Sequence, residues 1–201
     1  MCNKSIVALI AVATLFVSVS PVQAVLYPLV IFNNSTFAAD PQLSFSVEAL
    51  DGGTGKVDFI FRNTSTIDST IGQVYFDGGL LTGIASITNG TGTNFVVGST
   101  PADLPSGNTI GFAADFSAGA MLPPAQYGID PGESITVAVN LLGSHTLSEI
   151  TGQLDSGTMR IGAHIISVSC SEVSVSAVTP EPATIALLGL GSLILRKRSK
   201  R

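Results

Sequence analysis

The chain has 201 residues and a formal net charge of −5, but its charges are unevenly distributed. Six of the nine basic residues lie in the first 24 or the last six positions, so residues 25–177 carry 13 acidic and only three basic side chains. So acidic a segment repels nucleic acid and anionic lipid, which excludes nucleic acid as a partner. The roughly 155 residues between the two ends suffice for one domain with a hydrophobic core.

Residues 1–24 have the three parts of a secretory signal peptide. Lys4 supplies a positive start, an uncharged apolar run follows over residues 6–19, and Val22-Gln23-Ala24 is a small-residue cleavage site. We expect signal peptidase to cut after Ala24. The alternative is an uncleaved N-terminal membrane helix, for which the apolar run is short.

Alternation with a period of two residues dominates positions 25–177 and predicts an all-β domain. It is clearest over residues 42–63, where two alternating runs flank Asp51-Gly52-Gly53-Thr54-Gly55, a sequence typical of a hairpin turn. Many short strands separated by Gly, Pro and Asp favour an antiparallel β-sandwich or jelly roll. The remaining predicted strands are 71–76, 80–87, 94–97, 109–116, 134–142, 158–169 and 172–178.

Residues 144–154 depart from this pattern and predict one short helix. Leu147, Ile150 and Leu154 are spaced as on one face of a helix, and Thr146 or Ser148 is a suitable N-cap. Gly152 argues against a long helix.

Few side chains of residues 25–177 suggest chemistry. His145 and His164 are the only histidines, and we expect both to be structural or surface residues. Cys170 is the single cysteine left once Cys2 departs with the leader, so we expect no internal disulfide and interpret Cys170 as a half-buried strand residue. No metalloprotease, hydrolase or nucleotide-binding motif occurs. We therefore expect no catalytic residue, no cofactor and no metal site.

The turn between Asp51 and Asp58 leaves one alternative open. Ca²⁺ takes six to eight oxygen ligands from acidic, Gly-rich loops of this composition. The spacing matches neither an EF-hand nor a nonapeptide repeat, so a plain hairpin turn is the simpler interpretation.

Residues 178–201 combine three unlike parts in a fixed order. Pro180-Glu181-Pro182 comes first, and an uncharged, mostly apolar run occupies 183–195. As a helix this run would cover about 20 Å, against about 30 Å for the hydrocarbon core of a bilayer. Because the run is short, we expect a transient membrane stop, and because positive flanks stay on the cytoplasmic side, we expect residues 25–179 to lie outside. Residues 196–201 form the basic end, with charges on Arg196, Lys197, Arg198, Lys200 and Arg201.

This three-part tail resembles the PEP-CTERM sorting signal of bacterial surface proteins. The resemblance implies that an exosortase, a membrane-embedded protease, recognises Pro180, Glu181 and Pro182 and processes the tail. It also implies an exported protein that is held at the membrane through its C-terminal segment before processing, and then reaches the cell surface or extracellular matrix. Residues 153–164 are similar to strands that precede this tail in such proteins. The alternative is an ordinary single-pass anchor.

Our leading hypothesis is therefore a structural or adhesive surface protein without catalytic activity, for which exopolysaccharide is a candidate partner. One alternative is a surface module that binds polysaccharide, ice or calcium. A second is a hydrolase of matrix polymer that uses two carboxylates.

Overall fold

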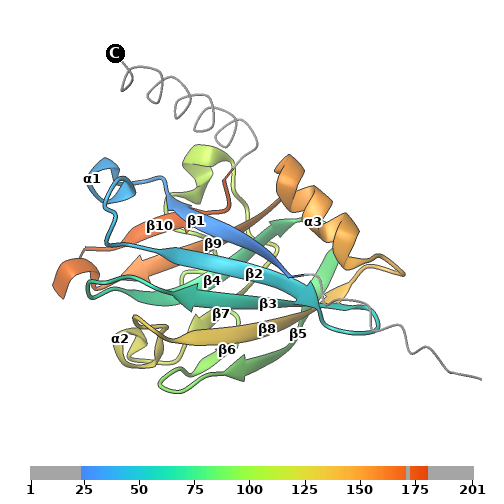
Figure 1. Ribbon diagram of the computed structural model, residues 1–201, viewed down its shortest axis with the longest axis horizontal. Coiled ribbons are helices and arrows are strands. Elements are labelled where there is room, and N and C mark those ends of the chain that lie inside the picture. Colours follow the sequence, from blue (N-terminus) through green and yellow to red (C-terminus); the bar gives the residue numbers. More distant parts are fainter. Residues whose placement is uncertain (1–23, 171–172, 181–201) are drawn as a thin grey trace, which may run out of the picture.

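The domain is built on a single sheet of ten antiparallel strands within the residues that the computed structural model describes, 24–170 and 173–180 (Figure 1). The strand order is β5-β8-β3-β2-β1-β10-β9-β4-β7-β6. The strands are β1 (Val25–Ile31), β2 (Phe45–Asp51), β3 (Lys56–Asn63), β4 (Thr70–Gly78), β5 (Leu81–Asn89), β6 (Phe95–Val97), β7 (Phe116–Ala120), β8 (Ser134–Leu141), β9 (Met159–Ile166) and β10 (Val175–Val178). The helices are α1 (Ser35–Ala38), α2 (Pro124–Tyr127) and α3 (Leu147–Ser156), with 3-10 turns η1 (Gly107–Ile110) and η2 (Val168–Cys170).

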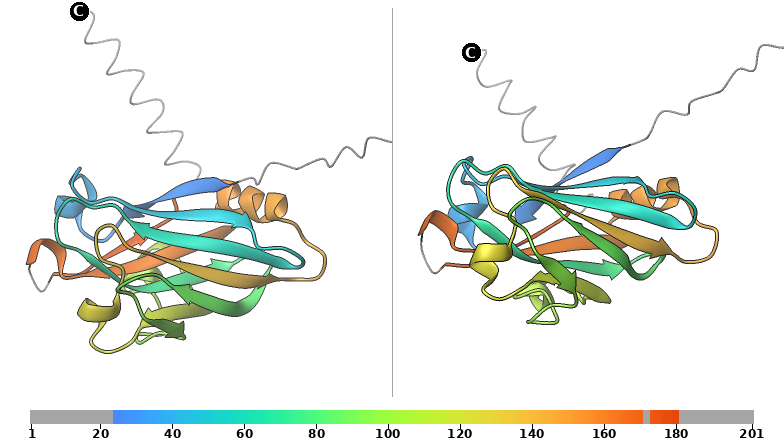
Figure 2. Two further views of the ribbon diagram at one scale, coloured as in Figure 1. Left: turned by 60° about the horizontal axis from the view of Figure 1, so that its bottom comes forward. Right: turned by 90° about the horizontal axis from the view of Figure 1, so that it is seen from below.

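Strand β1 links the two halves of this sheet by changing partners along its length. Residues 25–29 pair with β2, whereas Val30 and Ile31 pair with Val178 and Ala177 of β10. The sheet folds over on itself, so that β2, β3 and β8 lie across the core from β9, β4 and β7 (Figure 2). The antiparallel all-β class predicted from the sequence is confirmed.

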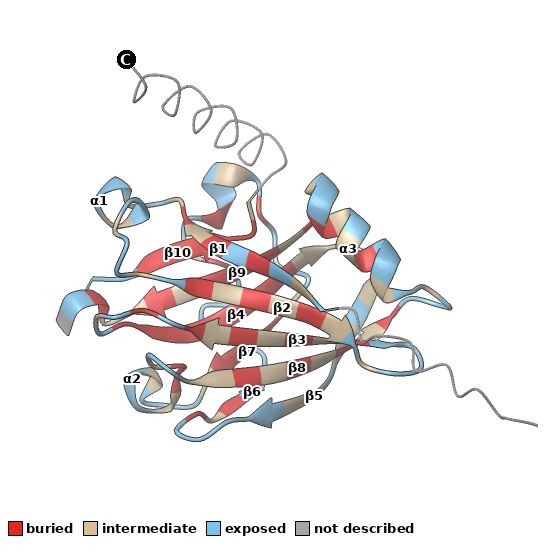
Figure 3. Ribbon diagram, viewed as in Figure 1, coloured by how far each residue is buried: buried red, intermediate tan, exposed pale blue. Residues whose placement is uncertain are grey.

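The core lies between these two layers and consists of the inward-facing residues of the alternating strands. Along β3 and β8 every second residue is buried, which appears as bands of red and tan in Figure 3. Phe76 of β4 meets Phe59 and Phe61 of β3, with ring centroids 5.3 and 6.0 Å apart. Aromatic pairs at such distances add to the burial of their apolar surface, so they fix how the layers face each other.

Most of the predicted elements are present. The hairpin over residues 42–63 is formed by β2 and β3, and Gly53 and Gly55 of its turn take positive φ. The short helix is α3, which begins after Thr146 as expected. Its first turn is held because the Thr146 N–H and hydroxyl both donate to Glu149 Oε2, at 2.8 and 3.0 Å.

The prediction of a strand over residues 109–116 is wrong. Residues 107–110 form the turn η1, bounded by Ser106 and Gly111 in the left-handed region, and β7 begins only at Phe116. The alternation of Ile110, Phe112 and Ala114 arises because this loop packs on the outer face of the sheet, beside Tyr75 and Val178.

One further prediction needs correction, and one strand was not predicted. Cys170 lies in η2 and not in a strand, because Ser167 and Ser169 take positive φ and end β9 at Ile166. Strand β1 was not predicted. Its Pro28 pairs with Ser46 of β2, and no strand pairs with β1 on the other edge at this position, because β10 pairs only with Val30 and Ile31. A proline is acceptable at such a position because it lacks a hydrogen-bond donor.

The predicted signal peptide and the predicted C-terminal hydrophobic helix lie outside the described residues. Among the helices of the described part, none has the length and apolar character needed to cross a bilayer.

The two edge strands, β5 and β6, approach each other and are bridged by one side chain, that of Asn89. Its Nδ2 donates to the Phe95 carbonyl at 3.2 Å, and its Oδ1 accepts from the Phe95 N–H at 2.7 Å. One amide side chain thus makes the pair of hydrogen bonds that a neighbouring strand residue would make. The sheet is therefore nearly closed.

Replacing Asn89 with alanine should open this seam and leave the buried Phe95 N–H without its acceptor. We expect the free energy of unfolding to fall by about 1–3 kcal/mol, with a drop of several degrees in the melting temperature. Thermal and denaturant unfolding of the purified protein measure both. Asn108→Ala, at an exposed position in η1, is the matched control and should change little; equal stabilities for the two variants would contradict the role of Asn89.

Candidate functional site at the C-terminal junction

Strand β10 is enclosed on both edges and both faces. It lies between β1 and β9, and each of its residues, Val175 to Val178, is buried. Ser176 faces outward beneath the loop of residues 99–115, where its hydroxyl donates to the Pro105 carbonyl at 2.7 Å. The strand therefore sits in the middle of the sheet, although it is the last element along the described chain.

Thr179 extends this enclosure one residue past the strand. Its N–H donates to the Ile161 carbonyl at 2.9 Å, and its Oγ1 accepts from the Ile161 N–H at 3.1 Å. The residue is 2% exposed, whereas Pro180 is only partly buried. The chain thus changes from fully enclosed to accessible between Thr179 and Pro180, the first residue of the Pro-Glu-Pro sequence.

The loop of residues 99–115 is held over β10 by Arg160 of β9. The Arg160 guanidinium donates to Asp77 Oδ2 through Nε at 3.0 Å and to the Ile110 carbonyl through Nη1 at 2.8 Å. It also lies 5.3 Å from the ring centroid of Phe112, a cation–π arrangement. The ion pair with Asp77 is largely shielded from water, so it holds the guanidinium in place against the loop carbonyls more firmly than an exposed pair would.

Removing β10 from the sheet would be costly. Full burial of one valine side chain contributes roughly 1.5–3 kcal/mol, and each satisfied hydrogen bond about 1 kcal/mol. β10 contains two buried valines and pairs with both of its neighbours. The junction therefore stays closed under conditions in which the domain is folded.

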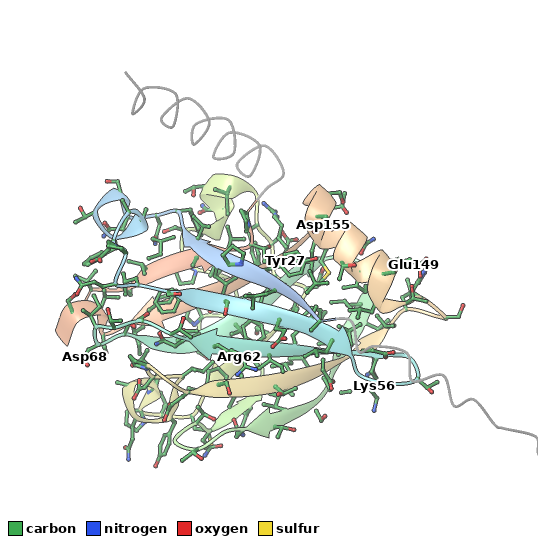
Figure 4. All side chains as sticks on the ribbon, in the orientation of Figure 1. Tyr27, Lys56, Arg62, Asp68, Glu149 and Asp155 are labelled. Carbon is green, nitrogen blue, oxygen red and sulfur yellow. The ribbon has the colours of Figure 1, made fainter. Side chains whose placement is uncertain are left out.

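The other end of the domain meets the predicted leader just as directly. Strand β1 begins at Val25, the residue after Ala24. Tyr27 of this strand reaches α3, where its hydroxyl donates to Asp155 Oδ1 at 3.2 Å (Figure 4). Burial, and then the nearby Asp155 carboxylate, raise the pKa of Tyr27, so the hydroxyl stays protonated as a donor. A cut after Ala24 would leave β1 whole.

The two histidines have separate structural surroundings. His145 precedes α3, and its Nδ1 lies 3.1 Å from Glu149 Oε1 at the surface. His164 lies in β9, with Nδ1 2.6 Å from Gln73 Oε1, and burial lowers its pKa below the usual 6.5. As predicted, His164 is on the same side of its strand as Arg160 and Gly162.

The acidic turn between Asp51 and Asp58 is a hairpin turn in which Asp51 Oδ1 accepts the Gly53 N–H at 2.9 Å. Within residues 24–170 and 173–180, no group of three or more His, Cys, Asp or Glu side chains is placed to hold a metal ion.

The fold and the junction define a class of protein: an antiparallel β domain in which β10, the last strand of the described residues, leads directly into the C-terminal segment. Residues 178–201 match the family described as the PEP-CTERM protein-sorting motif. The chain therefore carries this sorting motif, which implies an exported protein that passes the membrane and is processed by exosortase, a membrane protease. No curated protein and no solved structure matches the chain.

The structure describes only the beginning of the predicted sorting site. Pro180 follows the clamped Thr179, while Glu181, Pro182 and the basic cluster lie outside the described residues. Thr179 was not singled out from the sequence. The sequence did offer one signal: Thr179 follows Val175 and Ala177 at intervals of two residues, and alternate residues of a strand face the same side.

Stability should depend on His164 below neutral pH. Because its folded-state pKa lies below 6.5, the unfolded chain takes up the proton first, and the free energy of unfolding should fall as the pH drops below about 6.5. His164→Gln should remove this part of the pH dependence. Denaturant unfolding at pH 7.5 and 5.5 measures it, with the less buried His145→Gln as control. An unchanged pH dependence in His164→Gln would contradict the assignment.

Proposed function

We propose that this protein is a structural or adhesive component of the bacterial cell surface or extracellular matrix and has no catalytic activity. The observation that carries the proposal is the direct junction between a stable, enclosed β domain and a sorting motif. A tail of this kind delivers whatever precedes it, and here that is one acidic domain.

The proposed route has three steps. Signal peptidase removes residues 1–24 by cutting after Ala24, and the domain is exported. The apolar segment 183–195 and the basic cluster that starts at Arg196 then hold the chain at the membrane. Exosortase recognises Pro180, Glu181 and Pro182, and its action releases the domain to the surface.

We propose that the protein has no catalytic activity because of what surrounds its two histidines. His164 faces Gln73 from a partly buried position, and His145 faces Glu149 at the surface. Neither arrangement places a nucleophile beside a base that a third group orients.

As the finer description of the fold we propose a β-sandwich, supported by the change of partners along β1 that divides the sheet into two layers.

The sorting motif can be tested in a bacterium that has an exosortase. The wild-type chain should lose both ends, while Pro180→Ala/Pro182→Ala should keep its tail and stay in the membrane fraction. The reason is that proline fixes φ and prevents a helix from starting before the membrane, which keeps the motif extended. Intact mass and cell fractionation are the measurements. Pro41→Ala, at an exposed loop position, is the control, and identical processing of all three chains would refute the proposal.

A second candidate function is polysaccharide binding on the open face of β1, β2 and β3. A depression of about 450 Å³ lies there, lined among others by Ser44, Ser46, Glu48 and Arg62. Arg62 Nη2 contacts Glu48 Oε2 at 3.3 Å, and the Arg62 side chain is 42% exposed on the face turned toward the viewer in Figure 4. Charged groups and hydroxyls beside apolar side chains suit the hydroxyls and the ring faces of sugars.

Arg62→Ala should lower retention on exopolysaccharide from the producing strain at least fivefold, because it removes a positively charged and partly exposed donor from the lining of this depression. Co-sedimentation of the purified protein with the polysaccharide measures retention. Lys56→Ala removes the same charge from the other end of β3, outside the depression, and serves as the control. Equal retention of both variants would eliminate this candidate.

A further inference from the structure

The distance between the folded domain and the membrane segment is set by very few residues. Four steps along the chain separate Thr179 from Ala183, where the apolar segment begins. A fully extended chain covers at most about 3.6 Å per residue, so these four steps span no more than about 14 Å. An enzyme that acts on the motif therefore works directly beside the domain.

The residues before the motif are unavailable to such an enzyme. To cut a bond, a protease has to enclose the chain on both sides of it. Val178 and Thr179 are 8% and 2% exposed, and Thr179 is bonded through N–H and Oγ1 to Ile161. Cleavage upstream of Pro180 would require β10 to leave its place between β1 and β9.

We infer that the folded domain sets the upstream limit of processing, and that Thr179 is the residue that marks it. The enzyme reaches Pro180 and later residues, so the mature protein keeps β10 complete and ends at Pro180 or beyond. This inference rests on the proposed function for the enzyme's identity, but the limit itself is a property of the domain. Thr179 acts as a positioning residue, because the hydrogen bond that its hydroxyl oxygen accepts from the Ile161 N–H holds the end of the enclosed segment against β9.

The limit can be tested without exosortase. Elastase cuts after small apolar residues, and Ala177 and Val178 offer it two bonds just before the limit. The purified full-length chain should resist cutting at both bonds while it is folded. Thr179→Val keeps the shape of the side chain but leaves the buried Ile161 N–H without its side-chain acceptor. Because cleavage of a transiently opened segment follows the population of the open form, this variant should be cut about tenfold faster.

Two controls separate this effect from general loss of stability. Thr64→Val removes an exposed hydroxyl that donates to Ser44, far from β10 along the chain, and should be cut no faster than the wild type. Thr179→Ser keeps the hydroxyl and should restore resistance. Cleavage sites are read by mass spectrometry, and the melting temperature of each variant shows that it is folded. If Thr179→Val does not fold, the wild type and Thr179→Ser still test the limit.

The inference is overturned if the folded wild-type chain is cut after Ala177 or Val178, or if Thr179→Val and Thr64→Val are cut equally slowly. In cells, a mature C-terminus before residue 180 would overturn it as well. A chain that keeps its complete tail in the exosortase host would instead contradict the proposed function, while the elastase result would still decide the limit.

Discussion

The hydrogen bonding of β10 to β1 on one edge and to β9 on the other holds the two layers of the sheet together. On one side of β10 lie β1, β2, β3, β8 and β5, and on the other lie β9, β4, β7 and β6. Without β10, no strand pairing would join these groups along that line, because β1 has no other partner there. The core between the layers, including the contacts of Phe76 with Phe59 and Phe61, depends on this junction.

Polar side chains complete the structure at points where backbone pairing stops. Asn89 joins the edges of the sheet, Thr179 continues the bonding of β10, and Arg160 holds a loop through its carbonyls. Asn63, which is fully buried, donates to the carbonyls of Ser69 and Ile129 at 2.7 and 3.1 Å. Within the described residues, every buried side-chain nitrogen or oxygen has a partner. Such complete pairing favours one arrangement of the loops, because an unpaired buried group is costly.

Local patterns in the sequence were sufficient where the structure is itself local. The alternation of β2 and β3 and the Gly-rich turn between them predicted the hairpin, because a side chain's face follows from its place in the strand. The helical spacing of Leu147, Ile150 and Leu154 likewise predicted α3, and Thr146 was one of its two candidate N-caps. The sorting motif was also readable, since its three parts are continuous in the chain.

The errors arose where a long-range contact decides the structure. Ile110 and Phe112 alternate like strand residues, yet they pack on the outer face of the sheet under the control of Arg160, about 50 positions later. Strand β1 was not predicted, and whether a proline is acceptable at position 28 depends on which neighbours β1 has. The clamp at Thr179 depends on Ile161, 18 residues earlier, and no motif marks that pair.

The pairing of Val30 with Val178 also has a consequence for the timing of folding during export. Strand β1 cannot complete its pairing until β10 is available, so closure of the ladder across the middle of the sheet cannot precede the arrival of Val178 on the far side of the membrane. Until then the two halves expose apolar surface that the complete sheet buries. Only a chain exported through β10 can complete the sheet, and at that point the Pro-Glu-Pro sequence follows directly.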